Sequence, residues 1–335
     1  MQKTIFVVDD SLSNLSLAEE ALENHYRVIT LSSAEKMYRT LEKLMPDLIL
    51  LDIAMPDESG FDAMKKLKSN KAYAEIPVIF LTALTDTFNE ALGIELGAID
   101  FITKPFSEAV LLNRVKNHIQ IDELVHKRTE QLNSMKDSIV LTMSSLIESR
   151  DVCTGGHIER TTEFLRILLD AMIDHGVYVD EIKEWDRDSF VSSARLHDVG
   201  KIYVADTILN KPRSLSNAEF ESVKAHSSEG EKIIDQMIKQ TGDMEFLHSA
   251  KLVAAYHHER WDGTGYPYSL SGTEIPLPGR LMAIVDVYDA LVSERPYKKP
   301  MTHEEAVKVI ISESGKHFDP QIVEVFRSIH TRFVL

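Results

Sequence analysis

Cysteine, positive charge and long apolar runs are all scarce in this sequence. Cys153 is its one cysteine, so an internal disulfide is excluded and a reducing compartment is favoured. Lysine and arginine total 37 against 53 aspartates and glutamates, and the formal net charge of −16 opposes broad binding to nucleic acid. The longest apolar runs, such as residues 76–81, have the length of a strand rather than a membrane span, and no export signal is visible. We therefore expect a cytoplasmic protein that neither reads DNA nor inserts into a membrane.

Short apolar strands alternate with amphipathic helices over residues 1–120. We predict the strands at residues 4–9, 27–31, 47–52, 76–82 and 100–103. Such alternation is typical of a parallel sheet that is covered by helices on both faces. The sequence therefore predicts a doubly wound α/β domain with a five-stranded parallel sheet, whose functional crevice lies at the carboxyl ends of the strands.

A single long helix without glycine or proline is predicted from about Val110 to Ser149. Apolar side chains recur in it every seven residues, at Val125, Leu132, Ile139 and Leu146, with Ile121 and Met135 in the alternate position. This spacing favours a parallel coiled coil and hence a homodimer, and the alternative is a helix that docks on its own domains. Beyond residue 150 only helical patterns recur, among them residues 188–199 and 217–240. We expect a domain at 1–120, a helical linker at 121–147 and an all-α domain at 148–335.

Charged and hydroxyl side chains follow the strands of the predicted sheet. Asp9 and Asp10 end the first strand, Asp52 the third and Thr82 the fourth, and Lys104 follows the fifth. These strand ends are neighbours in a parallel sheet, so we expect the side chains to converge. Clustered carboxylates suit Mg²⁺, while the lysine and the hydroxyl can hold the oxygens of a phosphoryl group. The sequence thus predicts an aspartate built to be phosphorylated.

Residues 1–120 resemble the response-regulator receiver family, which implies a flavodoxin-like fold and a sensor histidine kinase as phosphodonor. The matching stretches are Val7-Val8-Asp9-Asp10, Leu50-Leu51-Asp52, Met55-Pro56, Gly60, Leu81-Thr82-Ala83 and Thr103-Lys104-Pro105-Phe106. By this resemblance Asp52 is the phosphoacceptor, and Asp10, Asp52 and the backbone carbonyl of Ala54 bind Mg²⁺. Thr82 and Phe101 occupy the positions that rearrange on phosphorylation.

The C-terminal half holds a second set of polar side chains at or near helix ends. They are His157, His197, Asp198, His226, His257, His258 and Asp286. Imidazole and carboxylate donors together suit Fe, Mn, Zn or Ni, and the absence of thiolate clusters argues against a structural zinc site. The set is too large for one tetrahedral ion but suits two ions, which at about 3.5–4 Å apart can clamp a phosphate. Taken singly, each histidine is more often an ordinary core or surface residue than a metal ligand.

Residues 140–335 resemble the HD phosphohydrolase superfamily, and in particular its HD-GYP branch. The matches are His197-Asp198-Val199-Gly200-Lys201 and His257-His258-Glu259-Arg260-Trp261-Asp262-Gly263-Thr264-Gly265-Tyr266-Pro267. The resemblance implies an all-helical domain that hydrolyses cyclic di-GMP at a metal centre. By it, Asp198 bridges two ions, and the other histidines and Asp286 complete their shells.

The resemblance also implies the substrate contacts and the number of metal ions. Lys201 would contact the scissile phosphate, while Arg295 and Lys298 would bind phosphates or guanine edges. Where some members carry a glutamate that supports a third ion, this chain has Cys153. We therefore expect two ions. Fe or Mn is favoured, with Zn or Ni as alternatives. The product, which is linear pGpG or GMP, is left open. Phosphorylation of Asp52 is expected to act on this centre through the long helix.

Two other functions stay open on the sequence alone. One is hydrolysis of a different nucleotide, such as a mixed cyclic dinucleotide or a guanosine polyphosphate. The other is a non-catalytic relay that binds a nucleotide or a partner protein.

Overall fold

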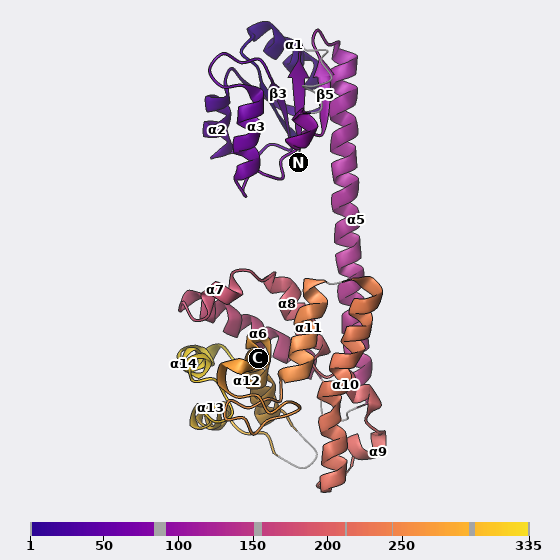
Figure 1. Ribbon diagram of the computed structural model, residues 1–335, viewed down its shortest axis with the longest axis vertical. Helices are drawn as coiled ribbons and strands as arrows, with labels where there is room; N and C mark the ends of the chain where they lie inside the picture. The colour runs from indigo at the N-terminus through magenta and orange to yellow at the C-terminus, as the bar shows by residue number, and fades with distance from the viewer. Residues whose placement is uncertain are drawn as a thin grey trace. The chain divides into compact units, whose positions relative to one another are not determined.

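A computed structural model describes residues 2–83, 92–150, 156–211, 213–242, 244–294 and 299–333 (Figure 1). The chain divides into two compact units, residues 1–131 and 132–335. The division falls within one continuous helix, α5 (Glu108–Glu148). Among the described ranges, no helix has both the length and the apolar composition needed to cross a membrane.

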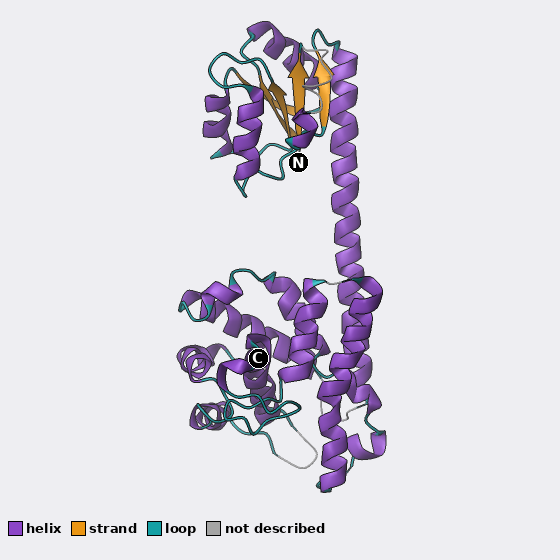
Figure 2. Cartoon of the chain, in the orientation of Figure 1, coloured by secondary structure: helices purple, strands orange, loops and turns teal. Residues whose placement is uncertain are grey.

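The strands of the first unit form one sheet (Figure 2). It is a five-stranded parallel sheet in the order β2-β1-β3-β4-β5. The strands are β1 (Thr4–Val8), β2 (Arg27–Leu31), β3 (Leu48–Asp52), β4 (Val78–Thr82) and β5 (Asp100–Thr103). Every residue of the three central strands is buried, as expected for a parallel sheet with both faces covered. The predicted doubly wound α/β fold is confirmed.

Alternate residues of the strands enter two separate cores. Ile5 and Val7 pack with residues of α1 (Leu12–Leu22) and α5, whereas Phe6 and Val8 pack with α2 (Ala34–Leu41) and α3 (Gly60–Ser69). This follows from the two-residue period of a strand, which sends successive side chains to opposite faces. The polar residues at the strand ends are left at one edge of the sheet.

The apolar stripe on α5 faces solvent. Its side chains are between 47% and 66% exposed, and they are Ile121, Val125, Leu132, Met135, Ile139 and Leu146. A different face of the same helix carries the buried residues Val140, Ser144 and Ile147. The stripe therefore faces solvent, whereas the face with Val140, Ser144 and Ile147 packs against other segments of the second unit.

The described part of the second unit is helical and has no strand. Its helices are α6 (His157–Asp174), α7 (Val179–Ile182), α8 (Arg187–Ser193), α9 (Asp206–Leu209), α10 (Asn217–Thr241), α11 (Glu245–Tyr256), α12 (Leu277–Val292), α13 (His303–Ser312) and α14 (Pro320–Ile329). Short 3-10 segments are η1 (Ala194–Leu196), η2 (Val199–Tyr203), η3 (Gly272–Glu274) and η4 (His330–Arg332). The helix expected over residues 188–199 instead ends at Ser193. The tighter turns of η1 and η2 follow, with His197 and Asp198 between them.

Two cores hold this unit together. The larger one joins α6, α8, α12, α13 and α14, and the smaller one joins the end of α5 to η1, η2, α10 and α11. Gly200 lets η2 lie directly on α10, since a Cβ atom at this position would stand 1.9 Å from the carbonyl oxygen of His226. This close approach brings Asp198 next to α10.

Candidate metal centre and phosphoacceptor site

The polar residues at the strand ends of the first unit do converge. Asp9 and Asp52 are buried, and the Lys104 ammonium lies 2.6 Å from Oδ2 of Asp9 and 2.7 Å from Oδ1 of Asp52. Carboxylate oxygens of Asp9, Asp10 and Asp52 lie within 4.8 Å of one another. Three carboxylates against one ammonium leave a local excess of negative charge. These oxygen donors therefore fit Mg²⁺.

Neighbouring residues orient this carboxylate cluster. Asn14, which the sequence did not single out, donates from Nδ2 to both oxygens of Asp9 at 3.1 Å. The backbone N–H of Ala54 donates to Oδ1 of Asp52 at 3.3 Å. Thr82 is buried at the end of β4, and the Phe101 ring packs against Phe80 with centroids 5.6 Å apart. The structure thus brings Asp9, Asp10, Asp52 and Lys104 together, whereas Phe101 packs on the apolar core beside Phe80.

The metal centre of the second unit is assembled from distant segments. His157 begins α6, His197 and Asp198 separate η1 from η2, and His226 lies in α10. His257 and His258 follow α11, and Asp286 lies in α12. Side chains more than a hundred residues apart in sequence meet here, and four of the histidines are almost fully buried: His157, His197, His226 and His257.

Asp198 lies between two groups of histidines. Its Oδ2 is 3.3 Å from Nε2 of His197, and its Oδ1 is 3.3 Å from Nε2 of His226. Nε2 of His157 is 3.3 Å from Oδ1 of Asp286 and 3.4 Å from Nε2 of His197. One carboxylate therefore faces two donor groups through its separate oxygens, which is the arrangement needed to bridge two ions.

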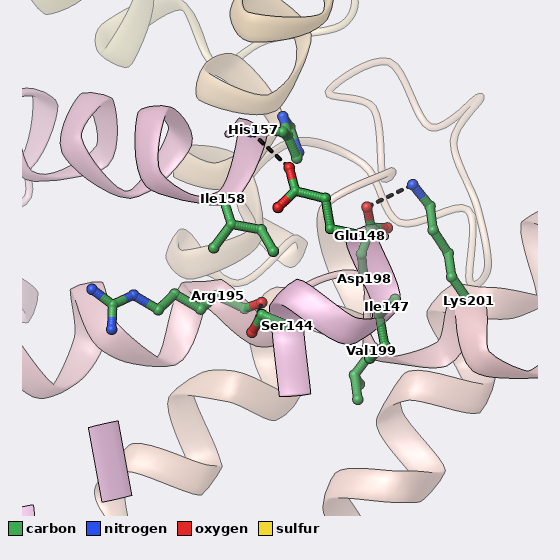
Figure 3. Close-up of a pocket in the computed structure, with 9 residues that line it drawn as sticks. All are labelled: Ser144, Ile147, Glu148, His157, Ile158, Arg195, Asp198, Val199 and Lys201. Atoms are coloured by element: carbon green, nitrogen blue, oxygen red, sulfur yellow. Dashed lines mark hydrogen bonds and ion pairs between the residues drawn. The ribbon is translucent and has the colours of Figure 1, made fainter. Parts of the chain in front are cut away.

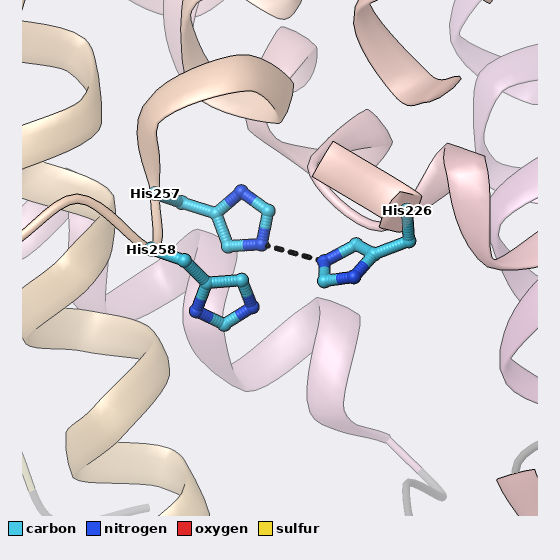
Figure 4. Close-up of side chains that lie close together, drawn as sticks. All are labelled: His226, His257 and His258. Carbon is cyan, nitrogen blue, oxygen red and sulfur yellow. Dashed lines mark hydrogen bonds between the residues drawn. The ribbon is translucent and has the colours of Figure 1, made fainter. Parts of the chain in front are cut away.

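The second donor group consists of His226, His257 and His258 (Figure 4), whose ligand atoms lie within 4.8 Å of one another. Nδ1 of His226 lies 2.6 Å from the carbonyl oxygen of Val223, and Nδ1 of His257 lies 3.0 Å from that of Val253. A carbonyl only accepts, so both Nδ1 atoms carry the proton and both Nε2 atoms present lone pairs. These two Nε2 atoms are 3.2 Å apart. Two facing lone pairs fit a cation between them.

Electrostatics favour the forms of these residues that bind a metal. Burial lowers the pKa of His226 and His258, and lowers that of His257 to about 3. Burial alone would raise the pKa of Asp198, but nearby Lys201 and the histidines hold it well below its usual range. The imidazoles of His226, His257 and His258 are therefore neutral at neutral pH, and the Asp198 carboxylate is ionised.

His157 behaves differently because two carboxylates face it. Burial lowers the pKa of its imidazole, but hydrogen bonds to Asp286 and Asp289 outweigh burial and raise the pKa to about 10. The Asp289 contact joins Oδ2 to Nδ1 of His157 at 2.7 Å. Arg160 donates to both oxygens of Asp289 at 2.6 and 3.0 Å. The Asp289 carboxylate thus fixes the His157 ring and leaves its Nε2 directed at Asp286 and His197.

The role of Asp289 was not predicted from the sequence. The available signal was its spacing from Asp286, because residues three apart lie on the same face of a helix. Asp289 is buried although it is charged. In metal sites, a buried carboxylate commonly accepts a hydrogen bond from a ligand histidine and so orients its ring.

Lys201 and the loop after α11 border the centre. The Lys201 ammonium lies 2.7 Å from Oδ2 of Asp198 (Figure 3). The Tyr266 ring packs against His258 with centroids 4.8 Å apart. Burial, reinforced by the carboxylates of Asp198 and Asp286, raises the pKa of Tyr266. Glu259 holds the loop by accepting from the backbone N–H of Tyr268 at 2.7 Å.

A pocket opens beside Asp198 and Lys201, and its lining includes Ser144, Glu148 and His157 (Figure 3). Glu148 is a further residue at this site that was not predicted from the sequence. Arg295, Lys298 and Cys153 lie outside the described residues.

Fold and site together define a receiver domain joined to an HD-type metal centre. A family model described as "HD domain" matches residues 142–322, and one described as "Response regulator receiver domain" matches residues 5–116. The chain therefore belongs to the HD-domain family and carries a response-regulator receiver domain. Both resemblances drawn from the sequence are confirmed.

Several named proteins are similar to this chain over much of its length. A probable cyclic di-GMP phosphodiesterase of Vibrio cholerae serotype O1 is 38% identical, over 99% of this chain and 79% of that protein. The cyclic di-GMP phosphodiesterase response regulator RpfG of Xanthomonas campestris pv. campestris is 28% identical, over 96% of this chain and 86% of that protein. The 3'3'-cGAMP-specific phosphodiesterase 2 of Vibrio cholerae serotype O1 is 33% identical, over 61% of this chain and 38% of that protein.

Proposed function

We propose that this chain is a response regulator whose HD domain is a metal-dependent phosphodiesterase that hydrolyses cyclic di-GMP. The observation that carries the proposal is the position of Asp198, whose two oxygens face separate histidine groups. The names of two relatives similar to nearly the whole chain supply the substrate. Two divalent ions in such a centre supply an activated water and charge that stabilises the transition state.

The residues of the chain hold the ions and orient the substrate. Asp198, Asp286 and the histidines supply the ligand atoms. Lys201 adds a positive charge beside Asp198, where it can neutralise a phosphate oxygen during displacement. Arg295 and Lys298 stay predicted contacts to the phosphates or guanine edges. The Tyr266 ring forms one wall of the centre through its contact with His258.

The donor set favours particular metals, and it leaves the product of hydrolysis open. Nitrogen donors mixed with carboxylates suit Fe or Mn, with Zn or Ni as alternatives. In the receiver domain we propose Mg²⁺ at Asp10, Asp52 and the carbonyl of Ala54. Hydrolysis that ends at pGpG and hydrolysis that continues to GMP are distinguished by chromatography of the products.

Replacing Asp198 tests the proposal directly. Asp198→Ala should abolish hydrolysis of cyclic di-GMP and lower the metal content, because both ions lose a shared ligand. Its far-UV circular dichroism should match the wild type. Asp174→Ala, at an exposed position near the end of α6, is the control and should keep full activity. Turnover in Asp198→Ala at the wild-type rate would refute the metal-dependent mechanism.

A panel of substrates separates the rival functions. Relatives include an enzyme specific for 3'3'-cGAMP, so this mixed dinucleotide and guanosine polyphosphates are assayed beside cyclic di-GMP. The proposal expects the highest kcat/KM for cyclic di-GMP. A protein that binds metal and nucleotide but hydrolyses none of them would be a non-catalytic relay.

We also propose how the protein is regulated, how it assembles and where it is located. A sensor histidine kinase phosphorylates Asp52, and the change in the receiver alters turnover in the HD domain. The exposed apolar stripe on α5 pairs with the same stripe of a second copy, as its heptad spacing favours. The single cysteine favours a reducing compartment, and the cytoplasm is the location we propose.

A further inference from the structure

The C-terminal part of α5 packs one face on the segments that carry the metal ligands. Asp137, Val140, Ser144 and Ile147 are three or four residues apart and so share one face of the helix. Val140 and Ile147 are buried in the same core as Leu196 and Val199, which flank the His197-Asp198 pair. The helix that runs on from the receiver domain is thus part of the wall of the metal centre.

Ser144 ties this face to the backbone beside His197. Its side chain is 2% exposed, and its hydroxyl lies 2.9 Å from the carbonyl oxygen of Arg195. The same hydroxyl lies 2.7 Å from the carbonyl oxygen of Val140 within α5. Two turns before Ser144, Asp137 accepts a hydrogen bond from Ser192 at 2.9 Å. These contacts join α5 to the chain just ahead of His197.

Glu148, the last residue of α5, contacts the first metal ligand. Its Oε1 accepts a hydrogen bond of 2.8 Å from the backbone N–H of His157 (Figure 3). His157 is the first residue of α6, so its N–H has no acceptor within the helix. Helix N-termini need an outside acceptor, and here the carboxylate at the end of α5 provides it.

Arg150, two residues further on, holds the segment that carries Lys201. Its guanidinium donates to the carbonyl oxygens of Ile202 and Val204, each at 2.9 Å, and to the carboxylate of Asp206 at 2.7 Å. Ser144 therefore contacts the segment just before His197 and Asp198, and Glu148 contacts His157. Arg150 contacts the segment that carries Lys201.

We propose that Ser144, Glu148 and Arg150 are positioning residues through which the placement of α5 sets the geometry of the metal centre. The inference rests on the proposed metal-dependent hydrolase and names the route of its regulation. Metal binding depends on ligand positions to within about 0.2 Å. A small rotation or shift of α5 would move His157 relative to Asp198, and so change how firmly these residues would hold an ion.

The decisive variant is Glu148→Ala in the full-length protein, compared with Glu148→Gln and Glu130→Ala. The amide of the glutamine variant keeps an acceptor oxygen, and Glu130 is an exposed residue of the same helix. We expect Glu148→Ala to retain fewer ions per chain after gel filtration and to lose about 10–100-fold in kcat on bis(p-nitrophenyl) phosphate. Glu148→Gln should restore most of both values, and Glu130→Ala should match the wild type.

A second measurement tests the regulatory role. The ratio of kcat with and without beryllofluoride, which mimics phosphorylation of Asp52, should move toward one in Glu148→Ala and stay at the wild-type value in Glu148→Gln. Wild-type metal content or an unchanged ratio in Glu148→Ala would overturn the inference. Because neither readout uses cyclic di-GMP, a failure of the proposed substrate is distinguishable from a failure of the positioning role.

Discussion

The Asp289 carboxylate lies 2.7 Å from Nδ1 of His157 and so determines which nitrogen of this ring faces the metal centre. Asp289→Asn should weaken this control, because an amide holds the imidazole less strongly and leaves Arg160 without its charge partner. We expect a loss of about 10–100-fold in metal affinity or turnover. Competition with a chromogenic chelator measures the affinity. Asp174→Asn is the control, and equal affinities in the two variants would show that Asp289 is dispensable.

Gly200 tests the close packing of η2 on α10. In Gly200→Ala the added methyl would meet the His226 carbonyl oxygen, so the two segments must separate. Overpacking of this kind costs about 1–3 kcal/mol, and here it also moves Asp198 away from His226. Urea denaturation and metal analysis should both show the effect. Gly230→Ala, whose methyl would find neighbours at 3.4 Å, should be tolerated. Similar behaviour of the two variants would contradict this explanation.

The phosphoacceptor is tested in the receiver domain. Asp52→Asn should take up no phosphoryl group from acetyl phosphate, since an amide is not a nucleophile for this transfer. Phosphate-affinity electrophoresis of the full-length protein measures uptake, with Mg²⁺ present and then removed by a chelator. Asp57→Asn, at an exposed position on the following loop, should be phosphorylated like the wild type. Phosphorylation of the Asp52 variant would place the acceptor elsewhere.

Dimerisation through α5 is tested on its exposed stripe. Leu132 and Ile139 are 66% and 47% exposed, and a charge at each would face its counterpart across a parallel coiled coil. The double variant Leu132→Asp/Ile139→Asp should sediment as a monomer, whereas we expect the wild type to sediment as a dimer. Asn133→Asp adds a charge off the stripe and should stay dimeric. A monomeric wild type at micromolar concentration would rule out this assembly.

His317 predicts a specific pH dependence of stability. Burial, with the charge of Arg260 nearby, lowers the pKa of its imidazole from 6.5 to about 4. The unfolded chain therefore binds the proton more readily, and stability falls as the pH drops from about 6.5 to about 4. At pH 5 the loss relative to pH 8 is on the order of 2 kcal/mol.

The check for His317 is urea denaturation of the metal-free protein at both pH values. His317→Gln has no titrating group at this position, so its stability should depend less on pH over this range. Equal pH dependence in wild type and variant would show that other groups are responsible.

Much of the fold could be predicted because burial leaves a strong local pattern. The central strands are continuous apolar runs, since both faces of a parallel sheet are covered. The seven-residue spacing on α5 likewise identified the face that the structure exposes. The predicted helix over residues 188–199 was wrong beyond Ser193, because helical propensity does not reveal that the segment tightens into 3-10 turns around Asp198.

The sequence by itself determined which donors this protein has, since histidine and carboxylate motifs need no partner to be recognised. Only the tertiary structure decided how they are grouped and which residues hold them. The two oxygens of Asp198 reach different histidine groups because Gly200 lets η2 lie against α10. Asp289 and Glu148 act on His157 across long stretches of chain, and such contacts depend on packing geometry that no local pattern encodes.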